Sequence, residues 1–160
     1  MSLCTHLGQS MNFGNVLLIF LASTSLFGCA RYHDNGGELY HHYEQYENKV
    51  AYCLQSTSDG ATQFPKSEWL SSLDQHEQKT ILIYLSNMAM NNCIEKEKES
   101  LKFRLTKENS DVQKIISKWL ELDKEKVEKP SGVDEYQLEN LESQITTPFN
   151  TFQVFELIKK

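Results

Sequence analysis

Residues 74–107, DQHEQKTILIYLSNMAMNNCIEKEKESLKFRLTK, form the longest helical pattern in the chain. Asp74, followed three residues later by Glu77, has the spacing of a capping box, which predicts a helix that begins at Gln75. The first half of the segment is apolar over most of its circumference, whereas the second half keeps only one thin apolar stripe. We therefore expect one long helix, from Gln75 to about Lys107, whose first half is the buried centre of an all-α domain.

The segment that precedes the long helix predicts a helix, a loop and a short helical turn. Apolar residues recur at spacings of three and four across residues 38–55, which predicts a helix with one buried face. Residues 56–66, STSDGATQFPK, are rich in Ser, Asp, Gly and Pro and therefore predict a loop. Ser67 then predicts the cap of a short helical turn that carries Trp69 and Leu70.

The segment that follows the long helix predicts three more helices. Asn109 is expected to cap the first of them, which is strongly amphipathic. Its apolar residues are Val112, Ile115, Ile116, Trp119 and Leu120. A linker over residues 128–133 ends this helix, and Asp134 opens the next one. Thr147 and Pro148 predict a cap with proline at the first helical position of a terminal helix.

Composition predicts a folded and acidic helical domain. The chain carries a formal net charge of −6, and no Asp, Glu, Lys or Arg precedes Arg31. Lys and Arg do not cluster, which argues against nucleic acid or an anionic lipid surface as the main ligand. Because no strand alternation persists, the predicted fold class is all-α, a small bundle of about four to six helices.

Residues 16–27, VLLIFLASTSLF, form an uncharged apolar run near the N-terminus. As a helix this run would span about 18 Å, well short of the roughly 30 Å hydrocarbon core of a bilayer. Its length and the small residues near its end are typical of the apolar region of a signal peptide. No Lys or Arg precedes the run, and Met11 offers an alternative start that gives a signal of conventional length.

The apolar run ends at Leu26-Phe27-Gly28-Cys29, which resembles the lipobox of bacterial lipoprotein precursors. The resemblance rests on Leu26, on the small Gly28 and on the cysteine, whereas Phe27 is bulkier than the residue usual in the family. It implies cleavage between Gly28 and Cys29, a thioether between the Cys29 sulfur and diacylglycerol, and acylation of the freed amine. Two or three acyl chains anchor a protein stably, whereas a single chain is marginal.

The resemblance implies a cleaved signal peptide over residues 1–28, a lipidated tether over 29–37 and a helical domain over 38–160. A protein anchored in this way lies in the bacterial cell envelope, outside the inner membrane. Ala30, rather than Asp, follows the cysteine, which resembles the signal for the periplasmic face of the outer membrane. The alternative is an uncleaved signal anchor in which Cys29 is an ordinary buried cysteine.

The chain has four cysteines, Cys4, Cys29, Cys53 and Cys93. Cleavage would remove Cys4 and lipid would occupy Cys29, so that the oxidising compartment favours a disulfide between Cys53 and Cys93. Both of these cysteines continue the apolar face of their predicted helices, so we expect both thiols to face a core. Two separate buried free cysteines are the competing interpretation, since neither a CxxC spacing nor a nearby His favours a metal.

The sequence predicts no catalytic, cofactor-binding or metal-binding residue. His33, His41, His42 and His76 are scattered along the chain. On a helix, His41 and His42 would point about 100° apart and could not share one ion. Ser, His and Asp residues occur without a nucleophile motif such as GxSxG.

Two aromatic groups are candidates for binding a partner. The first group lies on the predicted helix over 38–55 and consists of Tyr40, Tyr43, Tyr46 and Tyr52. The second lies on the predicted terminal helix and consists of Phe149, Phe152 and Phe155, spaced three residues apart. Tyrosine is common at interfaces, although core packing explains Tyr43 and Tyr46 equally well. A phenylalanine stripe of this kind docks more often on its own core than on a partner.

The favoured hypothesis is a non-enzymatic adaptor or assembly factor for an envelope complex, held at the membrane by its lipid anchor and bound to a protein partner. This plan of a lipid anchor followed by a small helical domain with one disulfide is similar to that of the pilotins, which escort secretins to the outer membrane. The similarity is one of plan only and identifies no binding residue. The alternative is an enzyme or a small-ligand binding protein with a pocket between helices.

Overall fold

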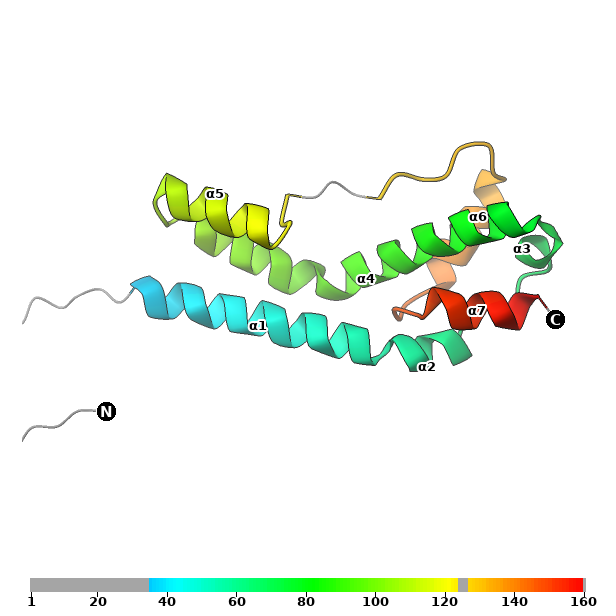
Figure 1. The fold of residues 1–160 in the computed structure, drawn as a ribbon, viewed down its shortest axis with the longest axis horizontal. Helices are drawn as coiled ribbons and strands as arrows, with labels where there is room; N and C mark the ends of the chain where they lie inside the picture. The colour runs from blue at the N-terminus through cyan, green and yellow to red at the C-terminus, as the bar shows by residue number, and fades with distance from the viewer. Residues whose placement is uncertain (1–34, 124–126, 160) are drawn as a thin grey trace, which may run out of the picture. The chain divides into compact units, whose positions relative to one another are not determined.

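The computed structural model describes residues 35–123 and 127–159, which contain seven α-helices and no strand (Figure 1). The helices are α1 Asn35–Gln55, α2 Thr57–Thr62, α3 Glu68–Ser72, α4 Gln75–Leu105, α5 Ser110–Trp119, α6 Glu135–Gln144 and α7 Thr151–Ile158. The predicted all-α fold with one disulfide is confirmed. The predicted signal peptide, its cleavage site and Cys29 lie outside the described residues.

Helix α4 begins and ends close to the predicted positions. The Asp74 carboxylate accepts hydrogen bonds from the backbone N–H groups of His76 and Glu77, and the Glu77 carboxylate accepts one from the Asp74 N–H. The capping box is therefore confirmed. With 31 residues, α4 is about 46 Å long, so it reaches along two separate apolar cores.

The first core lies on the N-terminal half of α4, where α2, α3, α6 and α7 cover it. Its buried side chains are Ala61, Leu70, Ile81, Leu82, Tyr84, Leu85, Ala89, Leu138, Leu141, Ile145, Phe149, Val154 and Phe155. One face of the first half of α4 is thus buried in a core, as predicted, whereas Ile83 on another face is 55% exposed. Each of the five helices contributes at least one side chain, so no single pair of helices could form this core alone.

The second core lies on the C-terminal half of α4, which packs along α1 (Figure 1). Its buried side chains are Tyr46, Cys53, Ile94, Leu101, Leu105 and Leu122. At the end of this core, Arg104 is buried and its guanidinium contacts two carboxylates. Its Nε lies 3.3 Å from Glu38 of α1, and Nη1 lies 2.9 Å from Glu108. These ion pairs hold the first turns of α1 against the end of α4.

The predicted loop over residues 56–66 is wrong in its first half, because Thr57–Thr62 form α2. The helix persists because a distant segment packs on it. The Asn150 N–H donates to the Thr57 carbonyl oxygen at 3.0 Å, and both Gly60 and Ala61 are buried. A contact between residues 93 positions apart along the chain cannot be predicted from local composition.

The predicted start of the terminal helix at Pro148 is also wrong. Helix α7 begins at Thr151, and the side chain of Asn150 caps it by accepting from the Gln153 N–H at 3.0 Å. Pro148 and Phe149 instead form a buried connection between α6 and α7. Phe149 is held there by the first core, where its ring meets that of Phe64 edge to face. Burial of an aromatic ring therefore outweighs the helical preference of the proline.

The remaining predicted caps are confirmed. The side chain of each capping residue accepts from a backbone N–H in the first turn of its own helix: Ser67 for α3, Asn109 for α5 and Asp134 for α6. In the predicted linker, Gly132 has a φ of 78°, a left-handed conformation that glycine adopts readily. None of the helices in the described ranges is long and apolar enough to cross a membrane.

Candidate interaction surfaces

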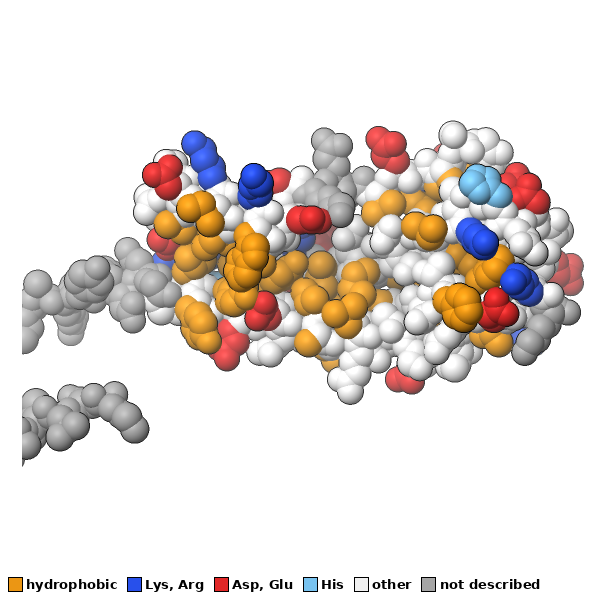
Figure 2. Space-filling view, viewed as in Figure 1, with side chains coloured by type: hydrophobic (Ala, Val, Ile, Leu, Met, Phe, Trp, Pro, Cys, Tyr) orange, Lys and Arg blue, Asp and Glu red, His pale blue; other side chains and the backbone are white. Residues whose placement is uncertain are grey.

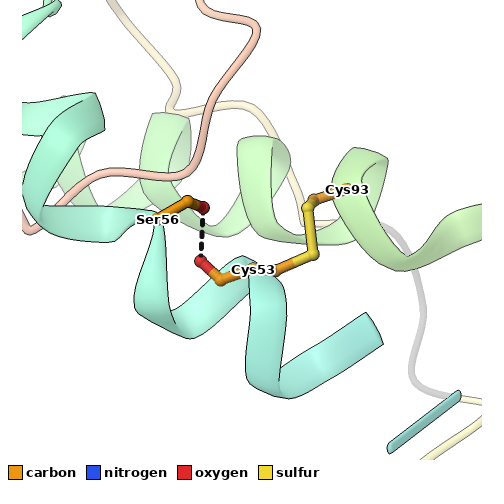
Figure 3. Close-up of a disulfide and its surroundings, with 3 residues drawn as sticks. All are labelled: Cys53, Ser56 and Cys93. Atoms are coloured by element: carbon orange, nitrogen blue, oxygen red, sulfur yellow. Dashed lines mark hydrogen bonds between the residues drawn. A yellow bond between two sulfur atoms is a disulfide. The ribbon is translucent and has the colours of Figure 1, made fainter. Parts of the chain in front are cut away.

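Cys53 of α1 and Cys93 of α4 form a disulfide, with their Cα atoms 6.2 Å apart (Figure 3). Cys53 is fully buried and Cys93 is half-buried, and both lie in the second core. The Ser56 hydroxyl donates to the Cys53 carbonyl oxygen at 2.8 Å, next to the end of α1. The predicted pairing is confirmed, and the alternative of two free cysteines is wrong.

Each of the two histidines of α1 contacts one polar side chain. His42 Nδ1 lies 3.1 Å from the Ser100 hydroxyl of α4, and His41 Nε2 lies 3.1 Å from the Gln45 side-chain amide. His76 is exposed in the first turn of α4, and His33 lies outside the described residues. Within residues 35–123 and 127–159, no group of three or more His, Cys, Asp or Glu is placed to hold a metal ion.

A polar cavity of about 570 Å³ lies against the middle of α4, with Tyr84 and Glu142 in its lining. The Tyr84 hydroxyl donates to the Glu142 carboxylate at 2.8 Å. Burial, and then this hydrogen bond, raise the pKa of Tyr84 far above its ordinary value, so the phenol stays protonated. Lys129 Nζ adds an ion pair to Glu142 at 3.5 Å. This arrangement joins α4 to α6, and the only O–H group of Tyr84 is engaged by Glu142.

A larger and more apolar groove lies between α7 and the segment that joins α2 to α3. We call it the terminal groove, and its volume is about 750 Å³. Its apolar lining consists of Ala61, Phe64, Pro65, Val154, Leu157 and Ile158. Lys66 and Glu68 add one charge of each sign to the lining. A second hollow of about 350 Å³ shares Ala61, Thr62 and Leu157 with the groove and is bordered by Phe152.

The terminal groove is open because α7 has apolar residues on more than one face. Val154 and Phe155 are buried in the first core, whereas Phe152 remains 71% exposed and Leu157 53% exposed. The predicted phenylalanine stripe is therefore divided, with Phe149 and Phe155 in the core and Phe152 on the surface. The sequence pattern contains all of these residues but does not indicate which of them stay exposed.

A second apolar surface lies between the N-terminal half of α1 and helix α5. Figure 2 shows hydrophobic side chains gathered over this part of the molecule. The ring of Tyr43 stacks on that of Trp119, with centroids 6.1 Å apart and planes inclined by 23°. Ile115 precedes Trp119 by one helical turn, and Tyr40 precedes Tyr43 by one turn. We call these four residues the α1–α5 patch.

The α1–α5 patch remains exposed because α5 presents apolar residues on two sides. Ile116 and Leu120 pack against the second core. Ile115 and Trp119 do not, and their exposed fractions are 68% and 69%. Of the tyrosines in α1, Tyr46 is buried, Tyr43 is half-buried, and Tyr40 and Tyr52 are exposed. The sequence predicts the amphipathic pattern of α5 but does not indicate that Ile115 and Trp119 stay exposed.

The fold and its surfaces define a small all-α, disulfide-bonded domain with two exposed apolar surfaces. Comparisons with models of protein families, with curated proteins and with solved structures find no match to this chain. The assignment of a function therefore depends on the residues described above.

Proposed function

We propose that the protein is a membrane-anchored lipoprotein of the bacterial envelope that acts as a non-enzymatic adaptor or assembly factor. Its lipid is carried by Cys29, and its terminal groove receives an apolar segment of a protein partner. The observation that carries the interaction role is the terminal groove, since two large apolar side chains of α7 stay exposed beside it. Exposed apolar surface around a groove often marks a contact site.

The disulfide supports the extracytoplasmic location. Disulfides persist in oxidising compartments and are rare in the bacterial cytosol. Cys53 and Cys93 pair with each other, which leaves Cys29 as the single thiol of the chain after the proposed cleavage. A cysteine directly behind an apolar segment and a small residue is the arrangement that resembles a lipobox.

The composition of the terminal groove supports a protein partner. Phe64, Pro65 and Leu157 present apolar surface, while Ser67, Ser71 and Thr62 offer hydroxyl groups in the same lining. An apolar centre with polar groups around it is usual for protein interfaces. Because the groove is lined by charges of both signs, we expect recognition by an apolar segment of the partner rather than by a charged one.

Substitution of Cys29 by Ala should abolish incorporation of a fatty acid analogue, because the mutant lacks the sulfur that receives the lipid. Metabolic labelling of cells that express each form measures this. The wild-type protein should carry the label and lack residues 1–28, as shown by its intact mass. A bare Cys29 thiol, or a signal segment still attached, would refute the anchor and favour the uncleaved alternative.

A photo-crosslinking amino acid in place of Leu157 should give a discrete protein adduct in living cells. The same substitution at Tyr136, which is exposed on α6 and outside the groove lining, is the control and should give none. Leu157→Glu should weaken binding of that partner by at least about tenfold, since an unpaired buried charge costs more than 1.4 kcal/mol. Tyr136→Glu should leave binding unchanged.

Adducts of equal yield at both positions, or none at either, would contradict binding in the terminal groove.

The polar cavity at Tyr84 and Glu142 favours the second candidate function, a small-ligand binding protein. In that case Asn91→Leu and Asn92→Leu, which change its lining, would impair function in cells while Leu157→Glu would not.

A further inference from the structure

The α1–α5 patch lies at the end of the domain to which the N-terminal segment is attached. Helix α1 begins at Asn35, and Tyr43 follows within about 12 Å along the helix axis. Cys29 precedes Asn35 by six residues, which can span at most about 20 Å. A lipid on Cys29 would therefore keep the α1–α5 patch close to the membrane surface.

We infer that the α1–α5 patch contacts the interfacial layer of the bilayer that holds the lipid of Cys29. The inference rests on the proposed anchor and adds an orientation to it. Helix α5 then lies along the membrane surface with Ile115 and Trp119 directed into the lipid.

The side chains of the α1–α5 patch have the chemistry of the bilayer interface. Trp and Tyr combine an apolar ring with a polar group, and they concentrate at the level of the lipid headgroups. The Trp119 ring is stacked on Tyr43, so these two aromatic residues present one joined surface. Short amphipathic helices bind bilayers through an apolar face of this kind.

Charge around the α1–α5 patch indicates a neutral lipid surface. Lys114 and Lys118 flank Ile115 and Trp119 on α5, and the Tyr43 hydroxyl donates to the Glu47 carboxylate on α1. Both signs are therefore present, so attraction to anionic headgroups is not expected to drive the contact. We expect binding to zwitterionic phosphatidylcholine that salt does not weaken.

The size of the α1–α5 patch favours a membrane over a second copy of the chain. A stable dimer buries about 800 Å² on each partner, which is more than four partly exposed side chains provide. A tethered domain needs much less, because the anchor raises the local concentration of lipid to the millimolar range or above. Weak insertion of Trp119 is then sufficient.

The orientation leaves the terminal groove accessible to a partner. Helix α1 has 21 residues and is about 31 Å long, and the patch lies near its start. The groove is built from α7 and the segment after α2, which lie beyond the other end of α1 (Figure 1). The two surfaces can therefore be occupied at the same time.

The test attaches the chain that begins at Cys29 to phosphatidylcholine vesicles through a maleimide lipid, which reacts with its single free thiol. Brominated lipids in the vesicles quench tryptophans that enter the bilayer. The difference between the wild type and Trp119→Phe reports Trp119 alone, and the variant reports Trp69 in the first core. We expect loss of about half of the Trp119 emission, unchanged by added salt, and no loss for Trp69.

Equal quenching of the two tryptophans, or none of either, would overturn the membrane contact. Sedimentation of the unattached chain tests for a dimer. A concentration-dependent dimer that shields Trp119 from a soluble quencher would also overturn the membrane contact. Because the maleimide lipid replaces the cellular anchor, this result is independent of the labelling of Cys29 in cells. A protein that is never lipidated in cells refutes the proposed function, whereas an unquenched Trp119 refutes only the contact.

Discussion

Substitution of Cys53 by Ser should lower the free energy of unfolding by about 4 kcal/mol. The disulfide joins residues separated by 40 positions, and without it the unfolded chain regains the entropy of an open loop. The native state is also destabilised, because a serine hydroxyl would replace a fully buried sulfur. Since domains of this size are stable by about 5–15 kcal/mol, urea and thermal denaturation should show a large shift.

Four comparisons isolate the contribution of the disulfide. Cys93→Ser and the double variant should be destabilised to a similar degree, as should the wild type in reductant. Ala51→Ser places serine at an exposed position of α1 and should change stability little. In the denatured, unreduced chain that begins at Cys29, three free thiols instead of one would contradict the disulfide.

Substitution of Gly60 by Ala should destabilise the domain by about 3 kcal/mol. A Cβ atom at Gly60 would lie only 2.0 Å from the Pro148 carbonyl oxygen and 3.3 Å from the Phe149 Cα atom. Both neighbours are backbone atoms, so the connection between α6 and α7 must move. That movement would displace Phe149 from the first core and break the hydrogen bond from Asn150 to Thr57.

The sign of this effect distinguishes tertiary packing from helix propensity. Propensity alone predicts that alanine in a helix is about 1 kcal/mol more stable than glycine. Ser58→Ala, at an exposed position of the same helix, is the matched control and should change stability by less than about 0.5 kcal/mol. Denaturant unfolding measures both variants, and a stabilised Gly60→Ala protein would show that the close approach of Pro148 is absent.

The features that could be predicted from the sequence are mainly local. The caps at Ser67, Asp74, Asn109 and Asp134 each depend on a side chain and a backbone N–H two or three residues away. The pairing of Cys53 with Cys93 required more than local pattern, since the implied fate of the other two cysteines left one pair. The two cysteines also lie on the apolar faces of α1 and α4, which is consistent with the pairing.

The errors arose where distant segments meet. Gly60 indicated a loop by composition, yet the absence of its side chain is what allows the Pro148 backbone to pack against α2. Pro148 indicated a helix start, yet burial of Phe149 keeps this segment out of α7. Each residue is compatible with either interpretation until its partner in the fold is known.

The sequence by itself determined the all-α class and the long helix α4, because periodicity and capping act within a helix. It predicted the disulfide only through the resemblance of residues 26–29 to a lipobox, which left Cys53 and Cys93 as one pair. Only the tertiary structure decided which apolar residues remain on the surface. Ile115 and Ile116 are adjacent and have the same side chain, but Ile115 is exposed and Ile116 packs on the second core. Burial depends on what lies opposite a side chain, and that is a property of the assembled fold.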